Sequence, residues 1–507
     1  MSSATDTFGT TPLIRVSTGA RTPDGERALR TARNAADSVP IVRTGPTGIT
    51  AHTPLVAATD GGRTAMFADP TPTTIESLVE TLEGGTLPSE HADAIVDHDP
   101  DTETLPTPDS GPLSVGRRSV LGPCGWIDPV AADDWTFRSP ERSAAPAAEA
   151  GLCGRGRGDA VADAPVADAW ETARETEGDP VVVVNANDAD ERTRADGVLL
   201  GGAPMAVLDG MAAVARHVGA DDAVVYLNEA ETELRGRLRE AIDAASDSLP
   251  VVPQLVVGPD EFRAGSPTAA LEALEGSDRI EPRIQPPSPA EHGLYGRPTV
   301  VHTPRTFAHV RRAIEAPEGF DPAVPDPGTR LVTVTGDVAD PATLELGPNA
   351  GLGAVLAAVE LRGSFKMACV GGVLGGITRD LDVEPTGRSL GRAGLGPDGV
   401  VEVLNDERCV LETVGERARF ASTENSGRCV PGREGTKQLT ELLRDVYGGS
   451  LDAAGIRELA GVMRRSSNCW IGANAPRPVT TALDEFEPEF RAHADGRCPC
   501  GACAGQL

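Results

Sequence analysis

Apolar runs and amphipathic stretches alternate through the middle of the chain. Continuous β-branched or apolar runs at residues 180–184, 223–227 and 254–257 are typical of strands buried on both faces. Between them, residues 204–218 and 229–246 have helical periodicity, and Gly219 supplies a stop signal for the first helix. Strands that alternate with helices predict a mostly parallel sheet, so ligands are expected beyond the carboxyl ends of its strands.

The patterns before and after this region differ from it. The first part shows strand-like stretches at 13–16 and 54–58 and helical stretches at 28–36 and 75–82, followed by a linker rich in Pro, Asp and Thr at 97–112. Residues 328–400 show short strands such as 331–334 and many glycines, and residues 409–494 return to helical periodicity. The chain of 507 residues is therefore expected to form several domains.

The charge is strongly negative. The formal net charge is -30, and Lys366 and Lys437 are the only lysines, so nearly all basic residues are arginines. Such an acidic surface suits a cytoplasm with a high salt concentration, where screening removes self-repulsion. Binding to nucleic acid or to lipid headgroups is disfavoured, because both need a basic patch.

Signals for export or membrane insertion are not expected in this chain. Residues 1–6 lack the basic and apolar stretches of a signal peptide, which predicts a cytoplasmic protein. The most apolar stretch, 198–218, contains Asp209 and Arg216 and is predicted to be a buried domain helix, so no direct membrane insertion is expected. Nine cysteines, widely spaced except at the end of the chain, favour reduced thiols over a disulfide framework.

Several motifs resemble one known family. Residues 424–436 read ENSGRCVPGREGT, and residues 282–289 and 293–299 read PRIQPPSP and GLYGRPT. They resemble the NADH-oxidising flavoprotein subunit of respiratory complex I, known as its F-type subunit, and the related subunits of NAD-reducing hydrogenases and formate dehydrogenases. The resemblance implies an NADH dehydrogenase that uses FMN, a 4Fe-4S cluster and NAD(H), with other redox subunits of a complex I-like or hydrogenase-like assembly as partners.

The resemblance also implies the fold, an α/β multidomain chain. The expected order is a thioredoxin-like domain at residues 1–105, a Rossmann-like FMN-binding and NADH-binding α/β domain at 112–325, a β-grasp domain of the soluble-ligand-binding type at 328–402, a helical iron-sulfur-type domain at 405–495 and a Cys-rich tail at 496–507. Pro46 and Thr50 stand where the first domain of relatives carries cluster cysteines, and no cysteine precedes Cys124. A 2Fe-2S centre is therefore not expected in this domain.

The flavin site of the family is matched only in part. The glycine-rich loop at 151–160 reads GLCGRGRGDA, and glycines of this kind let backbone N–H groups approach a phosphate. The residues expected to contact the cofactor are Gly154, Arg155, Gly156, Asn185, Asp188, Asp190, Gly265 and Thr268. Asp159 places a negative charge in this loop, and Ser266, Pro267, Gln285 and Ser288 replace residues of the family's nucleotide pocket.

The cluster site is incomplete as well. The family's four cysteine positions hold Ser426, Cys429, Gly432 and Cys469, so two thiolates of a 4Fe-4S set remain. The tail contributes Cys498, Cys500 and Cys503, and one hypothesis joins these thiols to Cys429 or Cys469 as a zinc or cluster site. There are two alternatives. Cys500 and Cys503 could form a redox-active dithiol, or Cys429 and Cys469 could be inert buried thiols.

Two functions remain open on the sequence alone. The first is an NADH-oxidising, FMN-containing subunit that passes electrons through a 4Fe-4S cluster to a partner, as the resemblance implies. The second is a non-catalytic paralogue that keeps the fold for assembly or for binding a small ligand. The substitutions at Ser266, Gln285, Ser426 and Gly432 favour the second, because electron transfer needs both the flavin and an exit cluster.

Overall fold

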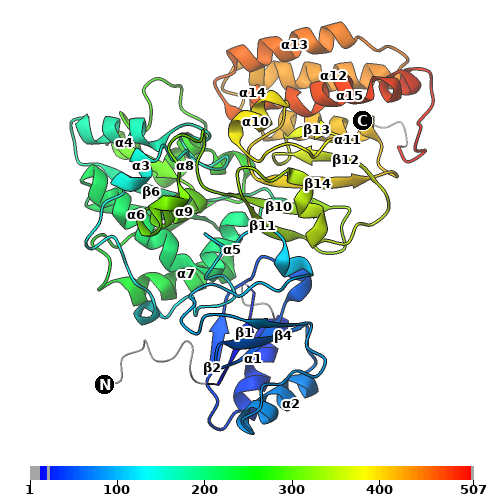
Figure 1. Cartoon of the computed structure of the whole chain (residues 1–507). Helices are drawn as coiled ribbons and strands as arrows, with labels where there is room; N and C mark the ends of the chain where they lie inside the picture. Colours follow the sequence, from blue (N-terminus) through cyan, green and yellow to red (C-terminus); the bar gives the residue numbers. More distant parts are fainter. Residues whose placement is uncertain (1–11, 20–22, 504–507) are drawn as a thin grey trace.

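The protein is seen in a computed structural model that describes residues 12–19 and 23–503. These residues form four parts that follow one another along the chain, with the first sheet at the bottom of Figure 1, the parallel α/β part at the left and the last two parts at the upper right. The expectations for residues 1–6 and for the end of the 496–507 tail lie outside the described residues. The limits of the four expected domains stay a prediction.

The first part is a five-stranded sheet with two helices packed on one face. The strand order is β2-β1-β3-β4-β5, with β1 and β2 parallel and the remaining neighbours antiparallel. Both helices bury apolar residues in the same cluster as strands β1 and β3. The elements are β1 (Leu13–Ser17), α1 (Pro23–Ala35), β2 (Ile41–Thr44), β3 (Leu55–Asp60), β4 (Arg63–Ala68), α2 (Pro72–Glu83) and β5 (Ala94–Asp97).

The stretch expected as a linker packs closely against the rest of the chain. Leu105 is buried, and its N–H donates to the carbonyl of Gly122 at 2.8 Å. The indole N–H of Trp126 donates to the carbonyl of Thr102, and the guanidinium of Arg15 stacks on the Trp126 ring at 3.5 Å. Residues 102–126 therefore cover the open face of the first sheet, and the end of the predicted linker at 97–112 is packed against it.

The second part is a parallel sheet, as the sequence pattern predicts. The strand order is β8-β7-β6-β9, and all three pairings are parallel. The strands are β6 (Val181–Ala186), β7 (Asp222–Asn228), β8 (Gln254–Gly258) and β9 (Thr299–His302). The helices are α3 (Ala145–Glu149), α4 (Val166–Glu175), α5 (Ala195–Gly202), α6 (Pro204–Val218), α7 (Thr232–Ala245), α8 (Pro267–Leu274) and α9 (Pro304–Glu315).

Helix α6 is the buried helix that the sequence predicts at 204–218. It ends at Gly219, whose φ of 77° is the left-handed conformation that favours glycine. Within the described residues, no single helix has the length and apolar composition of a membrane span; α5 and α6 reach it only when taken together, and they are bent by 98° to each other.

The third part is a mixed five-stranded sheet in the order β11-β10-β14-β12-β13. The central pair β10/β14 is parallel and the other pairs are antiparallel, which is the arrangement expected of a β-grasp sheet. Its elements are β10 (Arg330–Gly336), β11 (Ala342–Leu346), β12 (Phe365–Val370), β13 (Gly376–Thr378), α10 (Gly387–Arg392) and β14 (Val400–Asn405).

The fourth part is helical and packs on the β12–β13 side of this sheet, where α15 contacts β13. Met367, Cys369 and Ile377 of the sheet share one apolar cluster with the helices. The elements are α11 (Val410–Glu424), a π-helical turn (Pro431–Gly435), α12 (Thr436–Tyr447), α13 (Ala453–Ser466), α14 (Trp470–Asn474) and α15 (Pro476–Ala494).

Candidate functional sites

The glycine-rich loop lies beyond the carboxyl ends of β6 and β9, where the parallel sheet predicts a ligand site. Asn185, at the end of β6, holds the loop in place. Its amide Nδ2 donates to the carbonyls of Gly158 at 2.9 Å and of Gly265 at 3.0 Å, and the side chain is buried. The structure thus brings together the loop, Asn185 and Gly265, three of the segments expected to contact the cofactor.

Polar groups within the loop are already engaged with the protein. The N–H of Arg155 donates to Oγ1 of Thr306 at 2.9 Å, and its buried guanidinium donates to Asp326 and to the carbonyl of Pro327. Gly154 donates to the carbonyl of Ala164. At Gly156, whose φ is +85°, an added Cβ would lie 3.1 Å from the guanidinium carbon of Arg305. Side chains of the protein therefore fill the space beside the loop.

Arg157 extends from the loop into a buried ion-paired network. Its guanidinium donates to the carbonyl of Phe262 at 2.6 Å and to Asp188 at 3.1 Å, and it lies 3.9 Å from the centre of the Phe262 ring. Burial raises the pKa of Asp188, and the nearby guanidinium of Arg157 opposes this shift. Arg157 is not among the residues expected from the sequence to contact the cofactor, although it is a long cationic side chain inside a glycine-rich loop.

Arg305, at the start of α9, completes the network. It pairs with Asp196 at 2.7 Å and lies 3.9 Å from Asp188, and its Nη1 donates to the carbonyl of Asp398. Although burial opposes it, the charge of Asp196 holds the pKa of Arg305 above its usual range. Burial raises the pKa of Asp398 to about 7. Two cations and three carboxyl groups therefore occupy the interior beside the loop.

Asp159 turns its carboxylate back onto its own loop, where it lies 3.4 Å from the backbone nitrogen of Arg155 and accepts from the N–H of Val161 at 2.9 Å. Its carboxylate accepts hydrogen bonds from Nδ1 of His302 at 2.9 Å and from Oγ1 of Thr306 at 2.7 Å. Nε2 of His302 in turn accepts from the indole N–H of Trp170 at 2.8 Å. All three side chains are buried, so Trp170, His302 and Asp159 form one hydrogen-bonded chain inside the protein.

Two of the expected cofactor ligands serve neighbouring segments instead. Oδ2 of Asp190 accepts from the N–H of Val373 at 3.0 Å and thereby joins the parallel sheet to the β-grasp sheet. Oγ1 of Thr268 accepts from the N–H of Arg283 at 3.1 Å. These contacts, with those of Arg155, Arg157 and Asp188, do not fit a flavin phosphate, because the groups that would bind it already satisfy one another.

The two remaining cluster thiols lie in direct contact. Sγ of Cys429 and Sγ of Cys469 are 3.6 Å apart, and the N–H groups of Gly432 and Gly472 each donate to one of them at 3.3 Å. Burial raises the pKa of Cys469 to about 11. A Cβ at Gly432 would lie 2.9 and 3.1 Å from the two sulfurs. The residues present do not fit a four-iron cluster, which needs four ligands spread around it.

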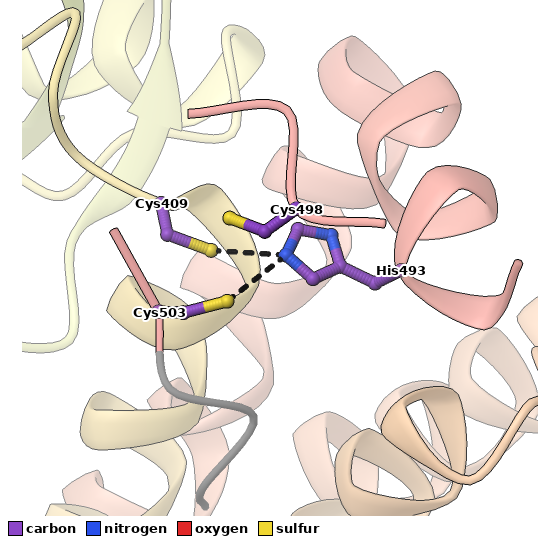
Figure 2. A group of neighbouring side chains, drawn as sticks. All are labelled: Cys409, His493, Cys498 and Cys503. Carbon is purple, nitrogen blue, oxygen red and sulfur yellow. Dashed lines mark hydrogen bonds between the residues drawn. The ribbon is translucent and has the colours of Figure 1, made fainter. Parts of the chain in front are cut away.

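A second group of thiols lies at the other end of the helical part. Cys409, His493, Cys498 and Cys503 place one ligand atom each within 4.8 Å of one another (Figure 2). The hypothesis that the tail cysteines join Cys429 or Cys469 is therefore wrong as to the partners. Helix α11 has 15 residues and is about 22 Å long, and it separates Cys409 from the Cys429 loop. Helix α15 carries the tail to the Cys409 end.

Comparison with known proteins identifies the relatives of this chain. Residues 147–312 match the model of the Nuo51 FMN-binding domain, and residues 412–493 match that of the NADH-ubiquinone oxidoreductase-F iron-sulfur binding region. The F 2 subunit of NADH-quinone oxidoreductase of Rhizobium meliloti is 30% identical over 68% of this chain and 87% of its own length. The NADP-reducing hydrogenase subunit HndC of Solidesulfovibrio fructosivorans is 28% identical over 76% of this chain and 85% of its own length.

A solved structure shows the same architecture. An NAD+-reducing [NiFe]-hydrogenase in the air-oxidized state matches with a TM-score of 0.63 and 25% identity, over 96% of this chain and 85% of that chain. The fold is thus that of the flavoprotein subunits of NAD-linked redox complexes. The chain belongs to the family of the F-type subunits of NADH-quinone oxidoreductase. The predicted family and fold class are confirmed, and the relatives are named as subunits of larger assemblies.

Proposed function

We propose that this chain is an F-type subunit that supports the assembly of a multi-subunit redox complex without itself carrying electrons through FMN or a four-iron cluster. The observation that carries the proposal is the pairing of the buried Arg157 of the glycine-rich loop with Asp188, whose side chain is 23% exposed. In a flavin site, a phosphate would supply the negative charge that the loop and its cation attract. Here a carboxylate of the protein supplies it.

The cluster position supports the same conclusion. Electrons that leave a flavin need an acceptor nearby, and the contact between the sulfurs of Cys429 and Cys469 leaves two ligands for what would be a cubane. We also propose that the eight expected cofactor residues now act in the interior of the fold, and that Cys429 and Cys469 are buried structural thiols. Partners would be other subunits of a complex I-like or hydrogenase-like assembly, in a cytoplasm of high salt concentration.

The second candidate function is NADH oxidation through FMN, which the match of residues 147–312 to an FMN-binding domain favours. One measurement separates the two. The full chain, purified anaerobically in concentrated salt, is examined for visible absorbance, extractable flavin and iron, and is then mixed with NADH. The proposal predicts a folded, colourless protein with flavin and iron far below one per chain. Flavin bands that bleach on addition of NADH would establish the oxidoreductase instead.

Reconstitution makes the test stricter, because a flavin can be lost during purification. The chain is incubated with FMN, and binding is followed through the flavin fluorescence. We expect no saturable binding in the micromolar range, whereas a stoichiometric, saturable complex would overturn the proposal. An Arg157→Gly variant, which removes the cationic side chain from the loop, serves as the comparison. Tighter FMN binding by this variant than by the parent chain would support the proposal that Arg157 blocks the flavin site.

A further inference from the structure

Three separate elements bring four metal-ligating side chains to one point. Cys409 lies at the N-terminus of α11, His493 lies in the last turn of α15, and Cys498 and Cys503 come from the tail. Nε2 of His493 is 3.2 Å from Sγ of Cys409 and 3.3 Å from Sγ of Cys503, and all four ligand atoms lie within 4.8 Å of one another. Figure 2 shows the sulfurs facing the same ring nitrogen.

The size of this group fits a single small metal ion. Zinc binds thiolate sulfur at about 2.3 Å and imidazole nitrogen at about 2.0–2.1 Å, so the ligand atoms of a tetrahedral site are roughly 3.5–3.8 Å apart. The contacts of 3.2 and 3.3 Å are slightly tighter than this, and the others need only small shifts. Three sulfurs and one nitrogen are ligands that zinc prefers.

The orientation of the imidazole favours a metal ligand. Nδ1 of His493 lies 2.7 Å from the carbonyl oxygen of Glu489, and a carbonyl can only accept, so Nδ1 carries the proton. Nε2 therefore presents its lone pair to the three thiols. A backbone carbonyl that fixes the tautomer in this way is a common partner of zinc-bound histidines. His493 is also buried, and its ring meets that of Tyr447 edge to face.

We propose that Cys409, His493, Cys498 and Cys503 bind one zinc ion in a closed tetrahedral site of structural type. The four protein ligands leave no open position for a substrate or a water molecule, which distinguishes a structural site from a catalytic one. The three cysteines of the site lie outside residues 412–493, the stretch matched by the iron-sulfur family model, and His493 is the last residue of that stretch.

The place of the site in the fold indicates what the zinc does. Cys409 lies four residues after the end of β14, at the passage from the β-grasp sheet to the helical part. His493 is near the end of α15, which packs against both α11 and β13. A metal ion bound here links the start of the helical part to its end and fixes the tail against that junction. The proposal does not depend on whether the chain binds flavin.

Cys500 provides a matched control within the same tail. Its sulfur lies 3.4 Å from Sγ of Cys498, but it is not a member of the four-residue group. Cys498, Cys500 and Cys503 are all partly exposed, so replacing one of them by alanine makes a similar change to the packing of the tail. A loss of metal from one variant and not from another therefore reports ligation, not disruption of the fold.

The test measures the zinc content of the full chain and of three variants. Proteins purified with zinc under reducing conditions and dialysed against a weak chelator are analysed by elemental mass spectrometry, and circular dichroism verifies that each is folded. We expect about one zinc per chain for the parent protein and for Cys500→Ala. For Cys503→Ala and His493→Gln we expect at least a fivefold loss of zinc, with the same helical signal as the parent.

A second readout follows the tail itself. Arg497, just before Cys498, is an exposed cleavage site for trypsin. A strong chelator should make the parent chain more sensitive to cleavage there. The same chelator should not change the cleavage of Cys503→Ala, because that variant already lacks the metal. A folded parent chain without zinc would overturn the proposal. It would also fail if Cys503→Ala retained the zinc, if Cys500→Ala lost it to the same extent, or if the bound metal were iron.

Discussion

Asp159 is a buried carboxylate whose oxygens are hydrogen-bonded by neighbouring side chains. The carboxylate is 0% exposed and is held by His302 and Thr306, while His302 is held by Trp170. A buried carboxylate is tolerated only when its oxygens are satisfied. Since these partners come from α4, β9 and α9, Asp159 links three elements of the parallel α/β part.

Replacing Asp159 by alanine should destabilise the protein markedly. The change leaves Nδ1 of His302 and Oγ1 of Thr306 buried without their acceptor, at a cost of about 3–5 kcal/mol in the free energy of unfolding. Urea unfolding followed by tryptophan fluorescence would measure this loss. The control is Asp243→Ala on the exposed face of α7, for which we expect a change within about 0.5 kcal/mol. Equal effects of the two substitutions would contradict the buried role of Asp159.

Asp398 should make stability depend on pH. Burial raises the pKa of Asp398 to about 7 in the folded chain, whereas the pKa of an aspartate in the unfolded chain is about 3.9. Between about pH 4 and pH 7, Asp398 is therefore protonated in the folded chain and ionised in the unfolded chain. Stability is therefore lost as the pH rises from about 4 to 7, by on the order of 1 kcal/mol per unit of pKa shift. Arg157, Arg305 and Arg477 oppose the shift, and Asp188 adds to it.

An Asp398→Asn variant tests this prediction, because the amide does not titrate. The difference in urea midpoint between pH 5 and pH 8 should be smaller in Asp398→Asn than in the parent chain, with the parent losing more stability at the higher pH. The exposed Asp247→Asn is the matched control and should reproduce the behaviour of the parent. If Asp398→Asn and the parent show the same pH dependence, Asp398 is ionised in the folded protein throughout this range.

Among the helices and strands, the sequence predicts those that have a regular pattern of apolar residues. The continuous apolar runs became β6, β7 and β8, and the amphipathic stretch at 204–218 became α6 with the same limits. The sequence pattern does not predict helix α9, because the polar residues Arg305, His309 and Arg311 are buried in it and interrupt the apolar pattern. Distant groups such as Asp196 and Asp209 pair with two of these residues, and a local pattern holds no information about them.

The candidate sites show the same limit. The resemblance to the family placed Asn185, Gly265 and the glycine-rich loop in one site, and the structure brings these three segments into contact. It placed Cys429 near Cys469, now seen at 3.6 Å, through the family motif. It could not show that the tail meets Cys409, because this depends on the direction in which a 19-residue helix carries the chain.

The turn around Gly432 allows a gain of function to be tested. A side chain at Gly432 would point at both remaining sulfurs, so a Ser426→Cys, Gly432→Cys variant would restore four thiols at this place. We expect this variant to take up about four irons per chain on anaerobic reconstitution with iron and sulfide, and the parent chain to take up far less. A Ser450→Cys, Gly432→Cys variant has the same number of cysteines and should resemble the parent. Equal iron uptake by the parent chain would contradict the proposal that it has lost the 4Fe-4S site.

For the whole molecule, the net charge of -30 is the dominant feature. Self-repulsion of this size destabilises the compact state at low ionic strength, and salt screens it as the Debye length falls from about 8 Å at 0.15 M to about 3 Å at 1 M. We expect the midpoint of thermal unfolding to rise by roughly 5 °C or more over this range. Near the isoelectric point the same salt series should have a smaller effect; a flat response at pH 7 would exclude repulsion as a limit on stability.

Glu345 has a consequence for the order in which this protein can be made. Its carboxylate, on β11, accepts from the N–H groups of Ser119, Val120 and Leu121, and the last of these is 224 residues away along the chain. During synthesis, the segment that covers the first sheet must wait for β11 to leave the ribosome before these bonds can close. Many multidomain chains mature one unit at a time from the amino terminus. This one reaches its final state only after two thirds of it has been translated.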